Sequence, residues 1–319
     1  MLCLSEQDIL HAVTFADIMA TVERAMIIYE EKSFHMPLRM HAEYMGNMLL
    51  LMPCLTSNTF GTKLVTLFPD NTNRNLPVLF GTMILNDGET GEPLALLNGS
   101  KLTALRTGAV GGVGIRYLAP ENTTKLGIIG AGVQGFHQVL FACTERKISD
   151  VFIFDQIAHK VPSFMENLSR KLPQVKFHQA ESTETILKES ELIITATNSE
   201  KPVLPNQIEL LRGKHFVGIG SYKPNMREFP DALFQILDQM FIDTEHAKEE
   251  SGDVIDPVKN EWIEKDQMFT FGKLIQKKIE SKAETTLFKS VGMALFDVVV
   301  SELIYEKAVE KGLGQEVVL

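Results

Sequence analysis

The stretch KLGIIGAGVQG, residues 125–135, decides the fold of this chain. An apolar run ends there in the pattern Gly130-Ala-Gly132-Val133-Gln134-Gly135, and apolar residues at helical spacing follow. A buried strand, a GxGxxG turn and a helix together are typical of a dinucleotide-binding unit. The first glycine permits a tight turn, the second lets the backbone approach a pyrophosphate, and the third lets helix and strand pack closely. Free amide groups at the start of the helix then bind the phosphates.

The segments after this turn alternate between strands and helices. The strand VFIFD ends at Asp155, about 20 residues beyond the turn, where such domains carry the acid that pairs with the adenosine ribose. A carboxylate there repels a 2′-phosphate, so Asp155 favours NAD(H), with NADP(H) as the alternative. Further strands are expected at VKFHQ, ELIITATN, HFVGIG and MFIDT. This alternation predicts a doubly wound α/β domain.

The N-terminal third is predicted to be rich in β-structure after two helices, the second over residues 15–31. LRMHAEY and MLLLMP flank Met45-Gly46-Asn47, a sequence that favours a hairpin. TKLVTLF alternates strictly, so Lys63 shares a strand face with Val65 and Leu67. A lysine on an apolar face is costly unless an anion lies beside it. Lys63 is therefore a candidate for binding an anionic group, the alternative being an ion pair with a carboxylate of the protein.

A glycine-rich segment, KLTALRTGAVGGVGIRYLA, is predicted to be a helix over residues 101–119, capped by Ser100. Its glycines, among them Gly108 and Gly111, weaken a helix, and close packing against another element best explains them. Arg106 lies in the first half, near the positive end of the helix dipole, where an anion is favoured. A guanidinium can hold a carboxylate with two parallel hydrogen bonds, so Arg106 is a second candidate.

Composition excludes several classes of protein. The chain has 319 residues, 45% hydrophobic and 23% charged, which is typical of a soluble protein of two domains. Its net charge of -10 argues against nucleic acid or an anionic membrane as partner. The N-terminus lacks the pattern of a secretory signal and no apolar run is long enough for a membrane span, so a cytoplasmic location is expected. Cys3, Cys54 and Cys143 are expected to be reduced core residues.

The whole chain resembles the ornithine cyclodeaminase and mu-crystallin family. The likeness is carried by Gly61-Thr-Lys63-Leu-Val, Leu102-Thr-Ala-Leu-Arg106-Thr107, the turn at 130–135, Glu250-Ser-Gly-Asp253-Val and Leu287-Phe-Lys-Ser290-Val-Gly292. The resemblance implies a Rossmann domain, residues 119–293, inserted into a second α+β domain, residues 1–118 with 294–319, that binds substrate and forms a homodimer. It also implies NAD(P)-dependent chemistry on a small amino acid or cyclic imino acid.

The resemblance assigns roles to individual residues. Arg39, Lys63 and Arg106 would bind the substrate, and Lys63 and Arg106 would also be catalytic. The expected cofactor residues are Gly130, Gly132, Val133, Gln134 and Gly135 at the turn, Asp155 at the ribose, and Thr107, Thr197, Gly220 and Ser290 elsewhere. His137 is interpreted as a packed or surface histidine. No metal is expected, because Glu249, Glu250 and Asp253 are interpreted as a solvated helix end without a further ligand at the right spacing.

Tyr222 marks a departure from the cyclodeaminases of the family, which carry an aspartate two residues before a proline as their acid and base. Here the segment is GSYKPN, so Tyr222 stands in that place. A phenol, with a reference pKa of about 10, is a poor general base at neutral pH. Tyr222 is a candidate catalytic residue that either donates a hydrogen bond or fills the vacated volume. Cyclodeamination needs repeated proton transfer, so the loss argues against it.

The leading hypothesis is an NAD(P)H-dependent reductase of a small cyclic ketimine, Δ1-pyrroline-2-carboxylate or Δ1-piperideine-2-carboxylate, giving L-proline or L-pipecolate. Lys63 would act as proton donor or fixed charge beside the imine. Three alternatives remain open: an ornithine cyclodeaminase, an alanine-type dehydrogenase, and a non-catalytic binding protein similar to mu-crystallin.

Overall fold

The computed structural model describes residues 1–281 and 284–318. The chain divides into two compact units, Met1–Arg106 with Met293–Leu319, and Thr107–Gly292. The division falls inside a helix, twelve residues before the boundary at 118/119 that the family resemblance implied. None of the helices in the described part of the chain is long and apolar enough to cross a membrane.

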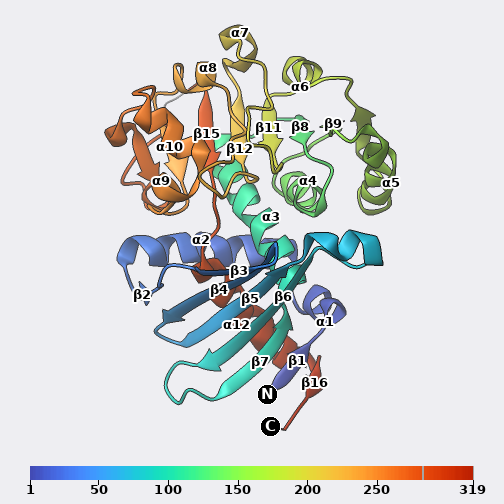
Figure 1. The fold of residues 1–319 in the computed structure, drawn as a ribbon, viewed down its shortest axis with the longest axis vertical. Coiled ribbons are helices and arrows are strands. Elements are labelled where there is room, and N and C mark those ends of the chain that lie inside the picture. The colour runs from blue at the N-terminus through green and yellow to red at the C-terminus, as the bar shows by residue number, and fades with distance from the viewer. Residues whose placement is uncertain (282–283, 319) are drawn as a thin grey trace. The chain divides into compact units, whose positions relative to one another are not determined.

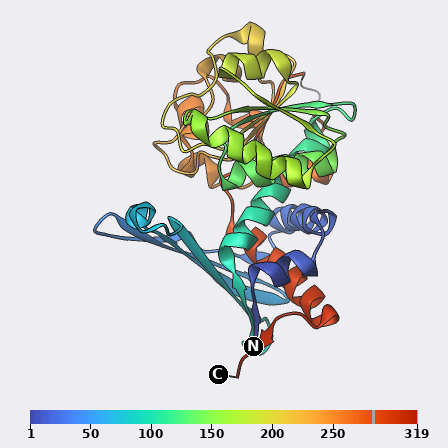
Figure 2. The same cartoon turned by 90° about the vertical axis from the view of Figure 1, so that its right-hand side faces the viewer.

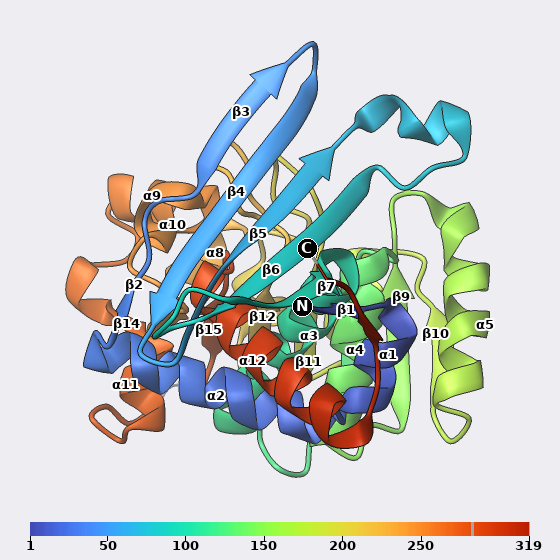
Figure 3. The ribbon, with the colours of Figure 1, turned by 90° about the horizontal axis from the view of Figure 1, so that it is seen from below.

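The first unit contains a largely antiparallel sheet in the order β16-β1-β7-β6-β5-β4-β2, with β3 paired to β4. Figure 3 shows β3 to β6 side by side. The strands are β1 (Leu2–Leu4), β2 (Phe34–His35), β3 (Met40–Tyr44), β4 (Asn47–Thr56), β5 (Thr59–Leu67), β6 (Leu79–Asp87), β7 (Pro93–Asn98) and β16 (Gln315–Glu316). The predicted hairpin is confirmed: Tyr44 pairs with Asn47, and Met45 and Gly46 both have positive φ, as a tight two-residue hairpin turn requires.

Among the residues that the structure describes, three α-helices belong wholly to this unit: α1 (Glu6–Ala12), α2 (Phe15–Glu31) and α12 (Ala294–Lys311). Ser5 and Thr14 begin the first two helices, each with a reciprocal capping box to the acid three residues on. Helix α12 packs against α2 and against β4 and β5, so the C-terminal segment returns to the N-terminal sheet. Figure 2 shows the blue helices and the red α12 on the same side of the sheet. The face of β5 that carries Lys63 and Val65 is buried.

The second unit contains a parallel sheet in the order β10-β9-β8-β11-β12-β15-β13-β14 (Figure 1). Its strands are β8 (Lys125–Ile129), β9 (Asp150–Phe154), β10 (Lys176–Gln179), β11 (Leu192–Thr195), β12 (His215–Gly218), β13 (Met240–Ile242), β14 (Met268–Thr270) and β15 (Thr286–Lys289). The first six strands of this order follow the Rossmann arrangement, whose direction reverses between β8 and β11. The predicted fold class is confirmed.

Helices connect the strands of this sheet. They are α4 (Val133–Glu145), α5 (Val161–Lys171), α6 (Thr183–Glu189), α7 (Ile208–Leu211), α8 (Asp231–Phe234), α9 (Ala247–Glu250), α10 (Gly252–Lys259) and α11 (Phe271–Ile275). Apolar side chains of the strands and helices pack into a buried cluster that includes Ile193, Phe216 and Leu287. This core holds the strand ends in a fixed register.

The glycine-rich helix α3 (Gly99–Leu118) confirms the inference of close packing. A Cβ at Gly108 would lie 2.4 Å from the ring of Phe141, and one at Gly111 would lie 1.8 Å from Oε1 of Gln138. The predicted cap was wrong: Ser100 lies inside the helix, and Oδ1 of Asn98 accepts the hydrogen bond from the amide of Lys101. Asparagine at the N-cap satisfies one of the free amides of the first turn, which is the function assigned to Ser100.

Candidate active site

The glycine turn has the geometry that a dinucleotide needs. Gly130 has φ +109°, which an L side chain rarely adopts, and a Cβ at Gly135 would lie 2.0 Å from the carbonyl oxygen of Gly130. A Cβ at Gly132 would meet nothing within 4 Å, so open space lies beside that backbone. Gly132 begins α4, whose first amides, at Val133 and Gln134, are the donors expected for phosphates. The turn therefore fits the pyrophosphate of NAD(H).

Asp155 follows β9 directly, and its carboxylate accepts hydrogen bonds from the glycine turn and from the turn after β9. Its Oδ2 accepts a hydrogen bond of 2.7 Å from the amide of Ala131, and its Oδ1 accepts one of 2.8 Å from the amide of Ile157. A carboxylate has about four acceptor sites, so these bonds leave capacity for ribose hydroxyls. The structure thus brings the predicted ribose residue to the predicted phosphate turn.

Two of the other predicted cofactor residues share one buried partner, Glu228, which the sequence analysis did not identify. Oε1 of Glu228 accepts from the amide and the hydroxyl of Thr197, at 2.7 and 2.8 Å. Oε2 accepts from the amides of Gly220 and Ser221, at 2.9 and 3.2 Å. Thr197 follows β11 and Gly220 follows β12, so one side chain joins two loops at the carboxyl edge of the sheet.

The two remaining cofactor candidates, Ser290 and Thr107, each form hydrogen bonds within the protein. The Ser290 hydroxyl donates to Oδ2 of Asp243 at 2.6 Å, and this carboxylate also accepts from the amides of Val291 and Gly292. The carbonyl of Thr107 accepts from Nε2 of Gln138 at 2.7 Å. The structure thus gives Ser290 and Thr107 local partners, and it adds Asp243 to the groups at the ends of the strands.

Lys63 and Arg106, the two predicted substrate cations, converge on Asp297. Nζ of Lys63 lies 2.8 Å from Oδ2 of Asp297, and Nε of Arg106 lies 3.0 Å from Oδ1. The three residues come from β5, α3 and α12, and they are 1%, 6% and 0% exposed. Asp297 was missed in the sequence, where it stands alone in the apolar run MALFDVVV. An isolated acid on a buried helix needs a partner, and that is the signal that could have found it.

The ion cluster of Lys63, Arg106 and Asp297 holds two cations and one carboxylate. Burial lowers the pKa of Lys63 to about 8, Asp297 opposes this shift, and the positive charges of Arg106 and Arg39 add to it. Arg39 lies just before β3, and its charge acts on Lys63, whereas direct contacts within the cluster join Lys63 and Arg106 to Asp297. The excess positive charge favours an anion, and Lys63 holds a proton that it can transfer near neutral pH.

Tyr222 lies in the loop after β12, between Ser221 and Lys223, and its side chain is 38% exposed. The same loop contains Gly220, whose amide donates a hydrogen bond to Glu228.

Two other residues had been interpreted from the sequence. His137 is 6% exposed and its Nδ1 lies 2.9 Å from the carbonyl oxygen of Val133, which confirms a packed histidine. Asp253 was wrongly interpreted as solvated, because it is 0% exposed. Its Oδ1 accepts from the amides of Glu228 and Phe229, both at 2.9 Å, which explains why a carboxylate is tolerated there.

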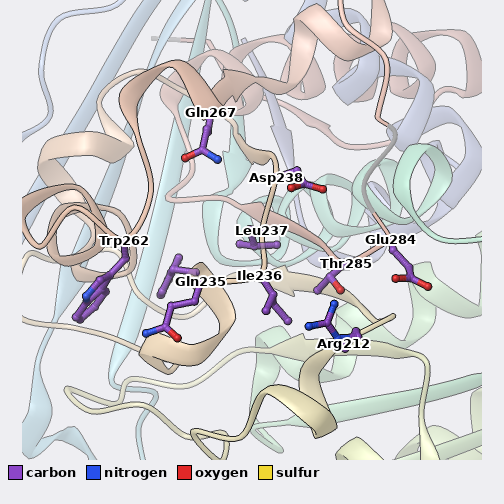
Figure 4. A pocket seen from close by; sticks show the side chains of 10 residues that line it. Arg212, Gln235, Ile236, Leu237, Asp238, Trp262, Gln267, Glu284 and Thr285 are labelled. Atoms are coloured by element: carbon purple, nitrogen blue, oxygen red, sulfur yellow. The ribbon is translucent and has the colours of Figure 1, made fainter.

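A cavity of about 380 Å³ lies elsewhere in the second unit (Figure 4). Arg212, Asp238, Gln267 and Thr285 line it, and each of them precedes a strand of the parallel sheet. The cavity therefore lies at the amino edge, whereas dinucleotides bind at the carboxyl edge. Among the described residues, no group of three or more His, Cys, Asp or Glu is placed to hold a metal ion.

Comparison with known proteins gives consistent matches along the chain. The model of the ornithine cyclodeaminase/mu-crystallin family matches residues 1–312. A Δ1-pyrroline-2-carboxylate reductase of Bacillus cereus is 33% identical over 328 residues, covering 99% of each protein. The structure of the Thermococcus litoralis Δ1-pyrroline-2-carboxylate reductase in complex with NADH and L-proline superposes with a TM-score of 0.92 at 32% identity, covering 99% of this chain and 100% of that one. An archaeal alanine dehydrogenase dimer with bound NAD gives a TM-score of 0.90 at 27% identity, covering 99% and 98%.

Proposed function

Because the chain belongs to the ornithine cyclodeaminase/mu-crystallin family, we propose that it is an NADH-dependent reductase of a small cyclic ketimine carboxylate, such as Δ1-pyrroline-2-carboxylate. Full-length similarity to reductases of that substrate supports the proposal. The observation that carries it is the buried ion cluster, in which Lys63 and Arg106 share the single carboxylate of Asp297. Burial also lowers the pKa of Lys63 to about 8. Such a group attracts a carboxylate and holds a proton that can be transferred at neutral pH.

Reduction of the ring C=N bond consumes one hydride and one proton. The reduced nicotinamide, when bound, supplies the hydride. Arg106 and Arg39 hold the substrate carboxylate; the bond to Asp297 uses Nε of Arg106, one of the five N–H groups of a guanidinium. Lys63 holds the proton at Nζ and gives it to the ring nitrogen, and Asp297 keeps Lys63 charged and in place. No proton step is assigned to Tyr222, which is partly exposed and either donates a hydrogen bond or fills the vacated volume.

The test of this function is NADH oxidation followed at 340 nm with purified protein. We expect turnover with Δ1-pyrroline-2-carboxylate alone and formation of proline. Turnover that requires pyruvate and ammonia instead would identify an alanine-type dehydrogenase. Proline formed from ornithine and NAD⁺ would identify a cyclodeaminase and overturn the proposal, as would binding of NADH without any turnover.

The cofactor assignment has its own measurement. The pyrophosphate turn and Asp155 support a preference for NADH over NADPH, because a carboxylate at that position repels a 2′-phosphate. We expect kcat/KM to be higher with NADH, and a preference for NADPH would contradict the role given to Asp155. The cytoplasmic location predicted from the sequence stays a proposal.

We also propose a homodimer formed through the outer face of the first sheet. By register Leu64 lies opposite Leu51 and Thr82, on the face of the sheet opposite Lys63. The apolar residues of this outer face include Leu49, Leu51, Leu55, Leu64 and Phe80. A sheet face left to water is normally polar, and an apolar patch marks an interaction site.

The dimer is tested by substitution on this face. Leu64→Glu should convert a dimer into a monomer in light scattering, whereas Leu10→Glu, at an exposed leucine of α1, should not. A monomeric wild-type protein would contradict the proposal.

A further inference from the structure

Glu228 is a buried carboxylate with an unusual set of partners. It is 0% exposed, and the four hydrogen bonds recorded for it come from three backbone amides and one hydroxyl. Burying a carboxylate is costly unless its oxygens are well bonded. Its donors lie in the loops after β11 and β12, so its charge is stabilised by the loops that it joins.

The backbone that carries Glu228 is itself held in place. Oδ1 of Asp253 accepts from the amides of Glu228 and Phe229, and Oγ of Ser221 lies 2.5 Å from Oγ of Ser251. The Ser221 hydroxyl also donates to the carbonyl of Met226 at 2.8 Å, which closes the loop on itself. The carboxylate therefore projects from a fixed support.

The loop after β11 lies against the glycine turn, and the loop after β12 lies against the loop after β11. A Cβ at Gly130 would lie 2.5 Å from the carbonyl oxygen of Ala196, in the loop after β11. A Cβ at Gly220 would lie 2.0 Å from the carbonyl oxygen of Thr197 and 2.6 Å from Oε1 of Glu228. The backbones of the three loops are thus in contact, and Gly220 packs directly against Thr197, the other residue that Glu228 holds.

The strand order shows which half of a dinucleotide these loops serve. The glycine turn follows β8 and Asp155 follows β9, so the adenosine and pyrophosphate lie on that side of the reversal point. The loops after β11 and β12 belong to the other half of the sheet, which takes the second mononucleotide in a Rossmann fold. Resting on the proposed function, we infer that Glu228 is a positioning residue for the nicotinamide half of the cofactor, which acts by fixing Thr197 and Gly220.

The chemistry of the four donors requires a carboxylate at this position. A glutamine could keep one oxygen toward Thr197, but its NH₂ group would then face the amides of Gly220 and Ser221, donor against donor. Glu228→Gln therefore releases the loop after β12 while changing the side-chain volume little. The glycine turn and Asp155 keep all of their own contacts.

The test compares two ligands on the full-length Glu228→Gln variant. NADH fluorescence titration should give a Kd at least about tenfold above wild type, whereas calorimetry with ADP, which lacks the nicotinamide and its ribose, should give a Kd within about twofold. Glu145→Gln is the matched control: it alters a largely buried carboxylate of the same unit that pairs with Arg116 and Arg146. It should leave the ratio of the two Kd values unchanged even if it lowers the melting temperature.

Equal weakening of both ligands, or no weakening, would overturn the inference. If Glu228→Gln does not fold, Thr197→Val serves instead, because it deletes the hydroxyl bond to Glu228 and keeps the amide bond; the hydroxyl's other bond, which it accepts from the amide of Ser199 at 3.3 Å, is also lost. This variant should raise the Kd of NADH alone, by a smaller factor, and an unchanged Kd would overturn the inference. A wild-type protein that fails to bind NADH would refute the proposed function, which is a separate outcome.

Discussion

The two units of the molecule each bury a group of charges, and the two groups are built in opposite ways. In the first unit, Lys63 and Arg106 share the single carboxylate of Asp297. In the second unit, Lys289 is 0% exposed and feels the charges of three buried carboxylates, which belong to Glu228, Asp243 and Asp253. The group in the first unit therefore carries excess positive charge, and the group in the second unit carries excess negative charge.

The difference in net charge and in bonding partners determines what each group of charges can do. The carboxylates of the second unit accept from backbone amides, so their charge serves to hold loops. Lys289 likewise donates to the carbonyls of Gly218 and Ser290. In the first unit the partners are side chains from three separate elements, and the surplus cation has no matching anion in the triad. That group is suited to a ligand, whereas the other is suited to scaffolding.

The largest effect is expected for Lys63→Ala. Loss of the proton donor should lower kcat/KM for the cyclic ketimine by about 100-fold or more, while the Kd of NADH stays the same. Lys307→Ala, at an exposed lysine paired with Glu310, is the control and should leave kcat/KM unchanged. A Lys63→Ala variant with normal turnover would remove the distinction between the two groups.

Replacing one carboxylate of each group by an amide compares how much each carboxylate contributes to stability. Asp297→Asn leaves two buried cations without their anion, so it should cost about 3 kcal/mol of unfolding free energy, measured as a loss of melting temperature. Asp253→Asn keeps the oxygen that accepts from Glu228 and Phe229, so it should cost less than about 1 kcal/mol. Similar losses for both variants would show that the two carboxylates act alike.

The pH dependence of stability should separate Asp253 from the other carboxylates. Burial raises its pKa to about 6, so the folded state holds this proton more tightly than the unfolded state does. The contribution of Asp253 to stability should therefore decline as the pH rises from about 4 to about 6. Asp253→Asn should abolish that decline in melting curves taken across this range, and an unchanged decline would assign it to another group.

The pH dependence of turnover should report Lys63. Its lowered pKa of about 8 means that the protonated form, which donates, is lost as the pH rises through about 8. We expect kcat/KM to fall above this pH in the wild type. Lys63→Arg should abolish the fall, because a guanidinium stays protonated throughout. A fall that persists in the variant would place the titrating group elsewhere.

The smallest effect is expected for Tyr222→Phe. The proposed mechanism gives no proton step to the hydroxyl, so its removal should change kcat/KM by less than about threefold in steady-state assays. A loss of tenfold or more would give Tyr222 a hydrogen-bonding role and make the loop held by Glu228 part of the chemistry.

Local sequence was sufficient for the dinucleotide-binding fold and for Lys63 and Arg106, two of the three residues of the ion cluster in the first unit. A glycine turn is readable because Gly130 needs positive φ and Gly135 needs close packing, both of which are local demands on residue type. Lys63 was found because strict alternation placed it on an otherwise apolar strand face, and Arg106 because it lies near the positive end of a helix dipole, where an anion is favoured. The role of each in binding substrate stays a prediction.

The buried carboxylates of the two groups, and the partners they bind, could not be identified from the sequence. Asp297 lies 191 positions from Arg106, and Glu228 lies 31 positions from Thr197, so neither pair has a spacing that a motif could encode. Asp253 was misread as solvated because an acid near a helix start is usually exposed, and nothing local shows that the amides of Glu228 and Phe229 will meet it.

The sequence by itself determined the elements, the turn chemistry and the buried cations, because backbone sterics and side-chain periodicity act over a few residues. Only the tertiary structure decided which anion each cation meets and which carboxylate holds which loop. Those pairings depend on contacts between strands and helices distant in the chain, and burial then decides whether a charge is neutralised within the protein or left for a ligand.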